Sequence, residues 1–260
     1  MCGVFFSQQI QLFFIKDYMV FKFKGVEVYY KLISKGESRP IVLLHGWGRS
    51  GEDFNEFISF WDNRTILTID FPPFGQSGDN LKDWNIYTYV SMVIFLCDHL
   101  NIDSADFVGH SFGGRIAMIL SCVKRSLVHS CILVDSAGMK PRRSLKYKLN
   151  LTIYKLKRKM GYHGKDRSSP DYKALSPAMK DTFKSIVNTH LENYAKHMHT
   201  PTLIVWGKND DQTPLYMAKR LKKLIKNSRL EILENGGHFS FMECGLEFFS
   251  IVYEFLRENL

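Results

Sequence analysis

Short apolar runs alternate with amphipathic stretches along most of the chain. Six runs have the length and apolar content of buried strands, and they span residues 41–45, 65–70, 105–110, 129–135, 201–206 and 228–233. Patterns with helical periodicity lie between or after them, near residues 52–60, 87–100, 112–124, 214–226 and 243–257. Strands that alternate with helices are typical of a parallel sheet covered on both faces. We therefore predict an α/β fold with a mostly parallel central sheet flanked by helices.

Before the first of these runs, polar and apolar residues alternate. The alternation covers Phe21–Gly25 and Val26–Ile33. A period of two predicts strands with one buried face, and the short gap predicts an antiparallel hairpin that starts the sheet. Residues 1–18 precede this pattern, and we expect them to be an extension ahead of the domain.

The alternation stops once, between about residues 139 and 199. Prolines and glycines interrupt short helical stretches there, and no strand pattern is evident. The segment from Lys140 to His199 holds 15 Lys and Arg against 4 Asp and Glu, a balance of +11, whereas the whole chain carries +9. Its first predicted helix has one apolar face, formed by Leu145, Leu149, Ile153, Tyr154 and Leu156. We predict a core of residues 19–138 and 200–260 with a basic helical insertion at 139–199.

The sequence Gly109-His-Ser-Phe-Gly-Gly114 connects a predicted strand directly to a predicted helix. Small residues on both sides of Ser111 permit a very tight turn that exposes the serine oxygen above the sheet. The N–H groups and the dipole of the following helix favour negative charge at that point. The alternative is that Ser111 has only a structural role, as the N-cap of the helix. The pattern favours Ser111 as a nucleophile.

A serine hydroxyl needs a base to remove its proton and an acid to orient that base. Asp210 lies in the loop after the strand at 201–206, and His238 lies in a glycine-rich loop after the strand at 228–233. Parallel strands place such loops at one edge of the sheet, the edge that also carries Ser111. The expected catalytic residues are Ser111, Asp210 and His238, in an order typical of hydrolases.

The strand at 41–45 ends in His45-Gly-Trp-Gly48. Glycines in this turn allow the backbone to approach a substrate closely. We expect the backbone N–H groups of Trp47 and Phe112 to form an oxyanion hole.

Four motifs occur in order from about Lys22 to Leu260, and together they resemble the α/β-hydrolase superfamily, in its serine-nucleophile, lipase- and esterase-like group. They are His45-Gly-Trp-Gly48, Asp70-Phe-Pro-Pro-Phe-Gly-Gln-Ser77, the turn around Ser111, and Trp206-Gly with Asp210, Pro214 and Gly237-His238. The resemblance implies that the first motif supplies an oxyanion donor and the second shapes a loop beside the site. It also implies that the insertion, after the sixth core strand, is a cap over the site. Pro73 stands where glycine is commoner in the family.

Other residues compete for the predicted roles. Asp211 adjoins Asp210, but its spacing from Trp206-Gly207 and Pro214 fits the motif less well. Asp135 ends the strand at 129–135, and some family members take their acid from that point. His45 and His110 lie beside the site, and in the family pattern they occupy structural positions.

Composition bears on the compartment, on metal and cofactor sites, and on binding to nucleic acid or membranes. The five cysteines, at positions 2, 97, 122, 131 and 244, show no paired spacing, which indicates reduced thiols and a cytoplasmic protein. The sequence contains no cysteine and histidine cluster typical of a metal site and no glycine-rich phosphate loop, so we expect neither metal nor cofactor. It also lacks a nucleic-acid recognition motif and an apolar run of about twenty residues that would cross a membrane.

The resemblance and the candidate triad lead to one expected activity, hydrolysis of a carboxylic ester through an acyl-enzyme. The alternatives are a carbon–carbon bond hydrolase for ring-cleavage products and a slow hydrolase that serves as a ligand receptor. The basic insertion is either a solvated polar face or an attractive surface for an anionic partner, such as an acyl carrier protein, a lipid surface or a negatively charged ester.

Overall fold

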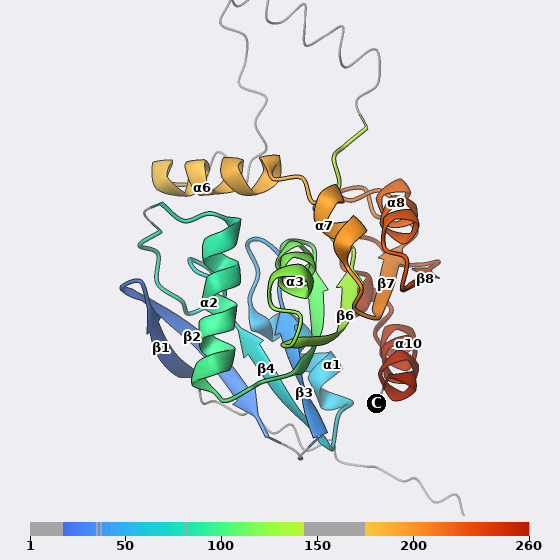
Figure 1. Ribbon diagram of the computed structural model, residues 1–260, viewed down its shortest axis with the longest axis horizontal. Helices are drawn as coiled ribbons and strands as arrows, with labels where there is room; N and C mark the ends of the chain where they lie inside the picture. The colour runs from blue at the N-terminus through green and yellow to red at the C-terminus, as the bar shows by residue number, and fades with distance from the viewer. Residues whose placement is uncertain (1–17, 35, 37, 82, 143–174, 260) are drawn as a thin grey trace, which may run out of the picture.

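The computed structural model describes residues 18–34, 36, 38–81, 83–142 and 175–259. Its centre is one sheet of eight strands in the order β1-β2-β4-β3-β5-β6-β7-β8 (Figure 1). The strands are β1 (Met19–Phe23), β2 (Val26–Ile33), β3 (Ser38–Leu44), β4 (Arg64–Ile69), β5 (Ala105–His110), β6 (Val128–Val134), β7 (Thr202–Gly207) and β8 (Ser228–Leu233). Strand β2 pairs antiparallel with β1 and β4, and every other pairing is parallel. The predicted mostly parallel sheet is confirmed.

Helices cover both faces of this sheet. They are η1 (Gly51–Phe54), α1 (Asn55–Ser59), α2 (Ile86–His99), α3 (Phe112–Val123), α6 (Pro177–Asn188), α7 (Glu192–His197), α8 (Tyr216–Leu224), α9 (Ser240–Glu243) and α10 (Gly245–Glu258). The predicted helix at 52–60 starts as a 3₁₀ turn, η1, and continues as α1. The predicted C-terminal helix is preceded by the short α9.

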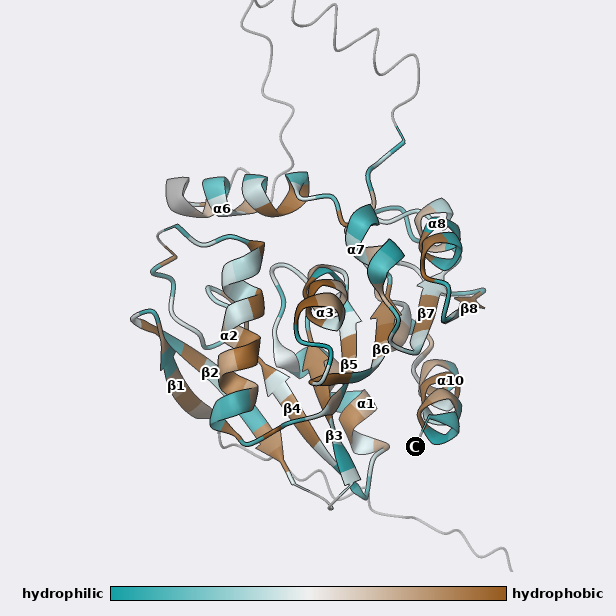
Figure 2. Ribbon diagram, viewed as in Figure 1, coloured by the Kyte–Doolittle hydropathy of each residue, from teal (hydrophilic) through white to brown (hydrophobic). Residues whose placement is uncertain are grey.

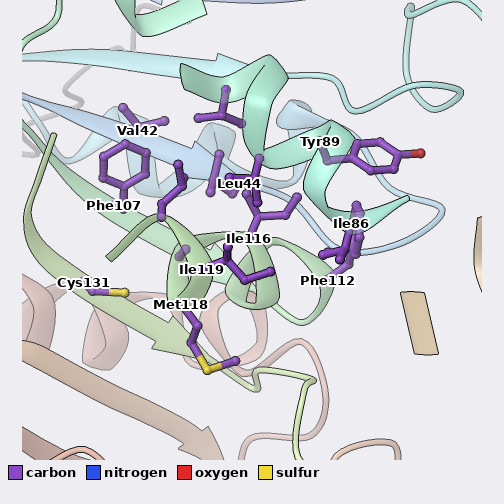
Figure 3. Close-up of a cluster of buried hydrophobic side chains, with 14 of the residues drawn as sticks. Val42, Leu44, Ile86, Tyr89, Phe107, Phe112, Ile116, Met118, Ile119 and Cys131 are labelled. Atoms are coloured by element: carbon purple, nitrogen blue, oxygen red, sulfur yellow. The ribbon is translucent and has the colours of Figure 1, made fainter. Parts of the chain in front are cut away.

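Successive side chains of β3 enter two different cores. Val42 and Leu44 join a cluster with residues of α2, α3 and α8, whereas Ile41 and Leu43 join a cluster with residues of α1 and α10. Figure 3 shows the first cluster, in which side chains of α3 lie against β3 and β5. Because both faces are covered, the central strands are apolar at most positions, and much of their length carries the hydrophobic colour in Figure 2. This is why they appear in the sequence as continuous apolar runs.

The insertion leaves the core between β6 and β7, after the sixth strand of the sheet. Its described parts, residues 139–142 and 175–199, contain the helices α6 and α7 and no strand. In Figure 1, α6 lies across the top of the view, beyond α2 and α3. The amphipathic helix predicted around Leu145 to Leu156 lies outside the described residues, as does the extension predicted at 1–18 apart from Tyr18.

A buried ion pair joins two strands near the start of β5. The Arg64 Nη2 atom lies 2.5 Å from Asp106 Oδ2, and both side chains are almost fully buried. Ser130 Oγ donates to Asp106 Oδ1 at 2.7 Å, and Arg64 Nε donates to the Arg39 carbonyl at 2.8 Å. A buried pair with its remaining groups satisfied costs little, but removal of one member leaves an unpaired charge in the core.

We therefore expect Asp106→Ala to lower the free energy of unfolding by about 3–5 kcal/mol, as urea titration would measure. The matched control is Asp98→Asn, because Asp98 pairs with Lys124 at 3.8 Å and both side chains are largely exposed. An exposed pair contributes about 0–1 kcal/mol, so the control should change stability little. Equal effects of the two substitutions would show that Asp106 is not a buried structural charge.

Candidate active site

Ser111 occupies a strained turn between β5 and α3. Its backbone angles are φ 47° and ψ −103°, a left-handed region that non-glycine residues rarely adopt. The turn requires glycine two positions after the serine because a Cβ on Gly113 would lie 2.0 Å from the Leu44 carbonyl oxygen. A Cβ on Gly109 would lie 2.7 Å from backbone atoms of Gly113 and Gly114. Backbone strain of this kind is concentrated at functional sites.

The structure brings Ser111, His238 and Asp210 into one chain of hydrogen bonds. His238 Nε2 lies 3.1 Å from Ser111 Oγ, and His238 Nδ1 lies 2.9 Å from Asp210 Oδ2. Asp210 follows β7 and His238 follows β8, so the two side chains come from neighbouring loops at the end of the sheet that carries Ser111. A histidine that donates from Nδ1 to a carboxylate presents Nε2 as an acceptor for the serine proton.

Backbone and hydroxyl donors surround the Asp210 carboxylate. Gln212 N and Thr213 N both donate to Oδ1 at 2.8 Å, and Thr213 Oγ1 donates to Oδ2 at 2.5 Å. Burial alone raises the pKa of Asp210, but the hydrogen bonds from His238 and Thr213 outweigh it and hold the pKa below its ordinary value. Asp210 therefore stays ionised and stabilises a protonated His238.

Asp135 has a different set of partners from Asp210. Its Oδ1 accepts from Gly207 N at 2.8 Å, and its Oδ2 accepts from Ser240 Oγ at 2.5 Å. Burial raises the pKa of Asp135 to about 7. The carboxyl thus ties the end of β7 to the segment that follows His238. Asp211, which adjoins Asp210, is exposed. Of the three aspartates considered from the sequence, Asp210 is the one that hydrogen-bonds the His238 imidazole.

The two histidines beside the site hold backbone segments in place. His45 Nδ1 donates to the Gly46 carbonyl at 2.7 Å and its Nε2 accepts from Phe71 N at 2.8 Å. His110 Nε2 donates to the His238 carbonyl at 2.7 Å. Burial lowers the pKa of both rings, that of His110 to about 3, so both are neutral at physiological pH.

A cavity of about 340 Å³ opens beside Ser111. Much of its wall is apolar and comes from the core loops and from α6, through Trp47, Phe112, Ala137, Phe183, Ile186 and Val187. Phe112 is the first residue of α3, where a backbone N–H has no acceptor within its own helix. Trp47 lies in the turn after β3, and its ring packs edge-on against that of Phe112 with centroids 5.5 Å apart. Both predicted oxyanion residues therefore line the same cavity as the serine.

Neither Arg115 nor the α6 residues of this wall are predicted from the sequence. Arg115 lines the cavity although it is almost fully buried. The available signal was one charged residue in the otherwise uncharged sequence of α3. The contribution of α6 carried no such signal, because it depends on how the insertion packs.

Among the described residues, no group of three His, Cys, Asp or Glu side chains is arranged to hold a metal ion. The described helices include none whose length and apolar character would let it cross a membrane.

Comparison with known proteins agrees with the fold. A family model described as the alpha/beta hydrolase fold matches residues 39–156 and 141–243. The chain belongs to the α/β-hydrolase family. As a member of it, the protein is a hydrolase with an eight-stranded, mostly parallel sheet.

Its relatives cover most of the chain at modest identity. The uncharacterized hydrolase YugF of Bacillus subtilis is 29% identical over 84% of this chain and 90% of its own length. A proline iminopeptidase of Lactobacillus crispatus is 25% identical, over 91% and 97% of the two chains. A 2-hydroxy-6-oxo-2,4-heptadienoate hydrolase of Pseudomonas putida is 23% identical, over 89% and 93%. A solved hydrolase from Pseudomonas aeruginosa has a TM-score of 0.75 at 17% identity, over 93% of this chain and 99% of that one.

The contacts of Asp210 and Asp135 predict that substitution of the first lowers turnover and substitution of the second lowers stability. Asp210→Asn should lower kcat for a soluble p-nitrophenyl ester by about 10³–10⁴-fold, because the amide no longer stabilises the imidazolium in the right tautomer. Asp135→Asn should instead lower the free energy of unfolding by about 1–3 kcal/mol, because its amide places a donor against the Gly207 or Ser240 donors. Stopped-flow or steady-state rates and urea titration measure the two effects. Near-normal turnover of Asp210→Asn with loss of activity in Asp135→Asn would move the acid role to Asp135.

Proposed function

We propose that the protein is a serine hydrolase that cleaves carboxylic esters through an acyl-enzyme, with Ser111, His238 and Asp210 as its triad. The observation that carries this proposal is the continuous chain from Asp210 through His238 to Ser111, with contacts of 2.9 and 3.1 Å, at the edge of an apolar cavity. A nucleophile, a base within hydrogen-bond reach and a group that orients the base are the parts that acyl transfer needs.

In this mechanism His238 Nε2 takes the proton of Ser111 as the serine oxygen attacks the ester carbonyl. Asp210 stabilises the imidazolium, and the N–H groups of Trp47 and Phe112 bind the oxyanion. Collapse of the tetrahedral intermediate breaks the bond to the alkoxide, which leaves with the proton from His238. Water then attacks the acyl-enzyme, with His238 as general base, and releases the acid and the free serine.

The same set of residues also suits other substrates of the family. The names of two relatives refer to a heptadienoate and to a peptidase acting at proline. A carbon–carbon bond hydrolase for ring-cleavage products is therefore the alternative enzyme, and a slow hydrolase used as a ligand receptor is the alternative of a different class. Ester turnover separates these possibilities, because a receptor is labelled at its serine but turns over slowly.

The experiment combines a fluorophosphonate probe with p-nitrophenyl esters of increasing acyl length. We expect rapid labelling of Ser111 and turnover of short acyl chains. Ser111→Ala and His238→Ala should each cost about 10⁵–10⁶-fold in kcat, and the double variant little more, because the residues act as a unit. Multiplication of the two losses would contradict the shared proton transfer. Labelling without ester turnover would favour the carbon–carbon hydrolase or the receptor.

We also assign the enzyme to the cytoplasm. The four described cysteines are free thiols, and burial raises the pKa of Cys97 and Cys131 to about 12. Buried, protonated thiols of this kind behave as small apolar side chains, and they support a reducing compartment.

The charge of the insertion supports a further element of the proposal, attraction of an anionic partner such as an acyl carrier protein, a lipid surface or an anionic ester. The segment from Lys140 to His199 carries a balance of +11, and the rest of the chain is close to neutral. The described helices α6 and α7 belong to this segment, and α6 contributes to the cavity wall beside Ser111. A positive field at the mouth of a cavity raises the rate of encounter with anions.

Such a field is screened by salt, with a screening length of about 10 Å at 0.1 M. We therefore expect kcat/KM for an anionic or micellar ester to fall as ionic strength rises, while that for a neutral soluble ester barely changes. Charge reversal of Arg142, Arg143 and Lys146 should flatten this dependence and leave the neutral substrate unaffected. Identical salt profiles for the two substrates would reduce the charge of the insertion to a role in solubility.

A further inference from the structure

Arg115 is a buried cation in the wall of the proposed catalytic cavity. Its side chain lies on α3 and is 7% exposed. Nη1 donates to the carbonyls of Ile186 and Thr189, at 2.9 and 2.8 Å. A guanidinium has five N–H groups, and those on Nε and Nη2 make no hydrogen bond to a described residue. Arg115 is also among the residues that line the cavity beside Ser111. The donors that are not bonded to the Ile186 and Thr189 carbonyls are therefore available to a ligand in that cavity.

No acidic side chain in the described structure neutralises this cation directly. The residues that line the cavity include neither Asp nor Glu. The second arginine of the wall, Arg49, already forms a two-point ion pair with Asp53, with both contacts at 2.7 Å. Glu192 acts on Arg115 only at longer range, since its carboxylate accepts from Lys140 N at 2.8 Å and pairs with Arg220 at 3.2 Å.

An unpaired charge in such a place is costly for the folded protein. Burial lowers the pKa of Arg115 to about 10, so the guanidinium is strongly desolvated yet still protonated at neutral pH. A charge taken out of water costs several kcal/mol unless a partner compensates it, and two carbonyl dipoles compensate only in part. A ligand that brings its own negative charge would complete the site.

The position of Arg115 relative to Ser111 defines where this charge lies in the substrate. Ser111 directly precedes α3, Arg115 is the fourth residue of that helix, about one helical turn further on, and both residues line the same cavity. The wall between and around them is apolar, through Phe183, Ile186 and Val187 of α6. The cavity thus combines a nucleophile, an apolar wall and a cation.

We propose that Arg115 binds a carboxylate on the substrate, so that the preferred substrate is an anionic ester whose carboxylate is separated from the scissile carbonyl by a short hydrocarbon chain. This proposal rests on the hydrolase function proposed above. A guanidinium matches a carboxylate with two parallel hydrogen bonds. The Ile186 and Thr189 carbonyls fix the plane of the guanidinium in advance, which reduces the entropy lost on binding.

The test uses two substrates with the same six-carbon diacid chain, one with a free carboxylate and one without charge: the mono-p-nitrophenyl ester of adipic acid and its methyl ester. We expect the wild-type enzyme to prefer the free acid in kcat/KM. Arg115→Gln should reduce kcat/KM for the acid by about 10- to 100-fold, mainly through KM, and change the neutral diester by less than about threefold. Arg115→Lys, which keeps the charge but loses the two-point geometry, should fall between them. Lys219→Gln removes an exposed positive charge from α8 and is the matched control, with no expected change in the ratio.

Three outcomes would overturn the proposal. The first is a wild-type enzyme that hydrolyses the diester as well as the acid. The second is an equal loss on both substrates in Arg115→Gln, which would assign Arg115 only to the attachment of α6. The third is a preference for the acid that disappears in 1 M NaCl, where the screening length is about 3 Å, because that would assign the preference to the distant charge of the insertion.

A binding measurement keeps the test valid if Arg115→Gln does not fold or if the protein hydrolyses neither ester. Calorimetry on the wild-type protein would compare hexanoate with hexanamide, which have the same chain and differ in charge. We expect hexanoate to bind at least about tenfold more tightly. Equal binding would refute the carboxylate site, whereas tight hexanoate binding without ester turnover or fluorophosphonate labelling would refute only the proposed hydrolase function.

Discussion

The close contact of the Ser111 turn with the end of β3 is the constraint on which the site depends. The helix α3 approaches the strand so closely that Gly113 N donates to the His45 carbonyl at 3.1 Å. No side chain fits at Gly113, and the backbone of Ser111 is held in a left-handed conformation. The same contact places the N-terminus of α3 beside the turn that contains Trp47. The contact that packs the helix against the sheet therefore also forms the proposed oxyanion site.

The aspartates at the ends of β6 and β7 illustrate how neighbouring acids acquire different properties. Asp210 receives donors from its own loop and from His238, which favour the ionised form. Asp135 is more deeply buried, and its pKa is raised by the loss of water. Thr213 links the two sites, since its hydroxyl lies 2.5 Å from Asp210 Oδ2 and 3.0 Å from the Asp135 carbonyl. The position of His238 thus depends on both acids. Asp210 binds its side chain, and Asp135 holds the segment that follows it.

Much of this arrangement could be predicted from the sequence because its signals are local. The strand predicted at 105–110 is β5, Ala105–His110, because a strand covered on both faces is a short, mainly apolar segment. The loops that carry Asp210 and His238 could be placed because parallel strands end at one edge of the sheet. The role of Asp135 could not be predicted, because its partner Ser240 lies 105 positions away. Arg115 was missed for the same reason, since its acceptor carbonyls lie 71 and 74 positions later, within the insertion.

The two ends of β5 have separate tasks, and this separation bears on how such a protein can evolve. The buried pair of Asp106 and Arg64 lies near the start of the strand, and Ser111 follows its end, about 16 Å further along. Effects of substitutions at sites this far apart, with no shared partners, are usually additive. A stabilising substitution near the start of the strand can then compensate a destabilising one in the cavity wall near its end. Substrate preference can therefore change while the fold is retained.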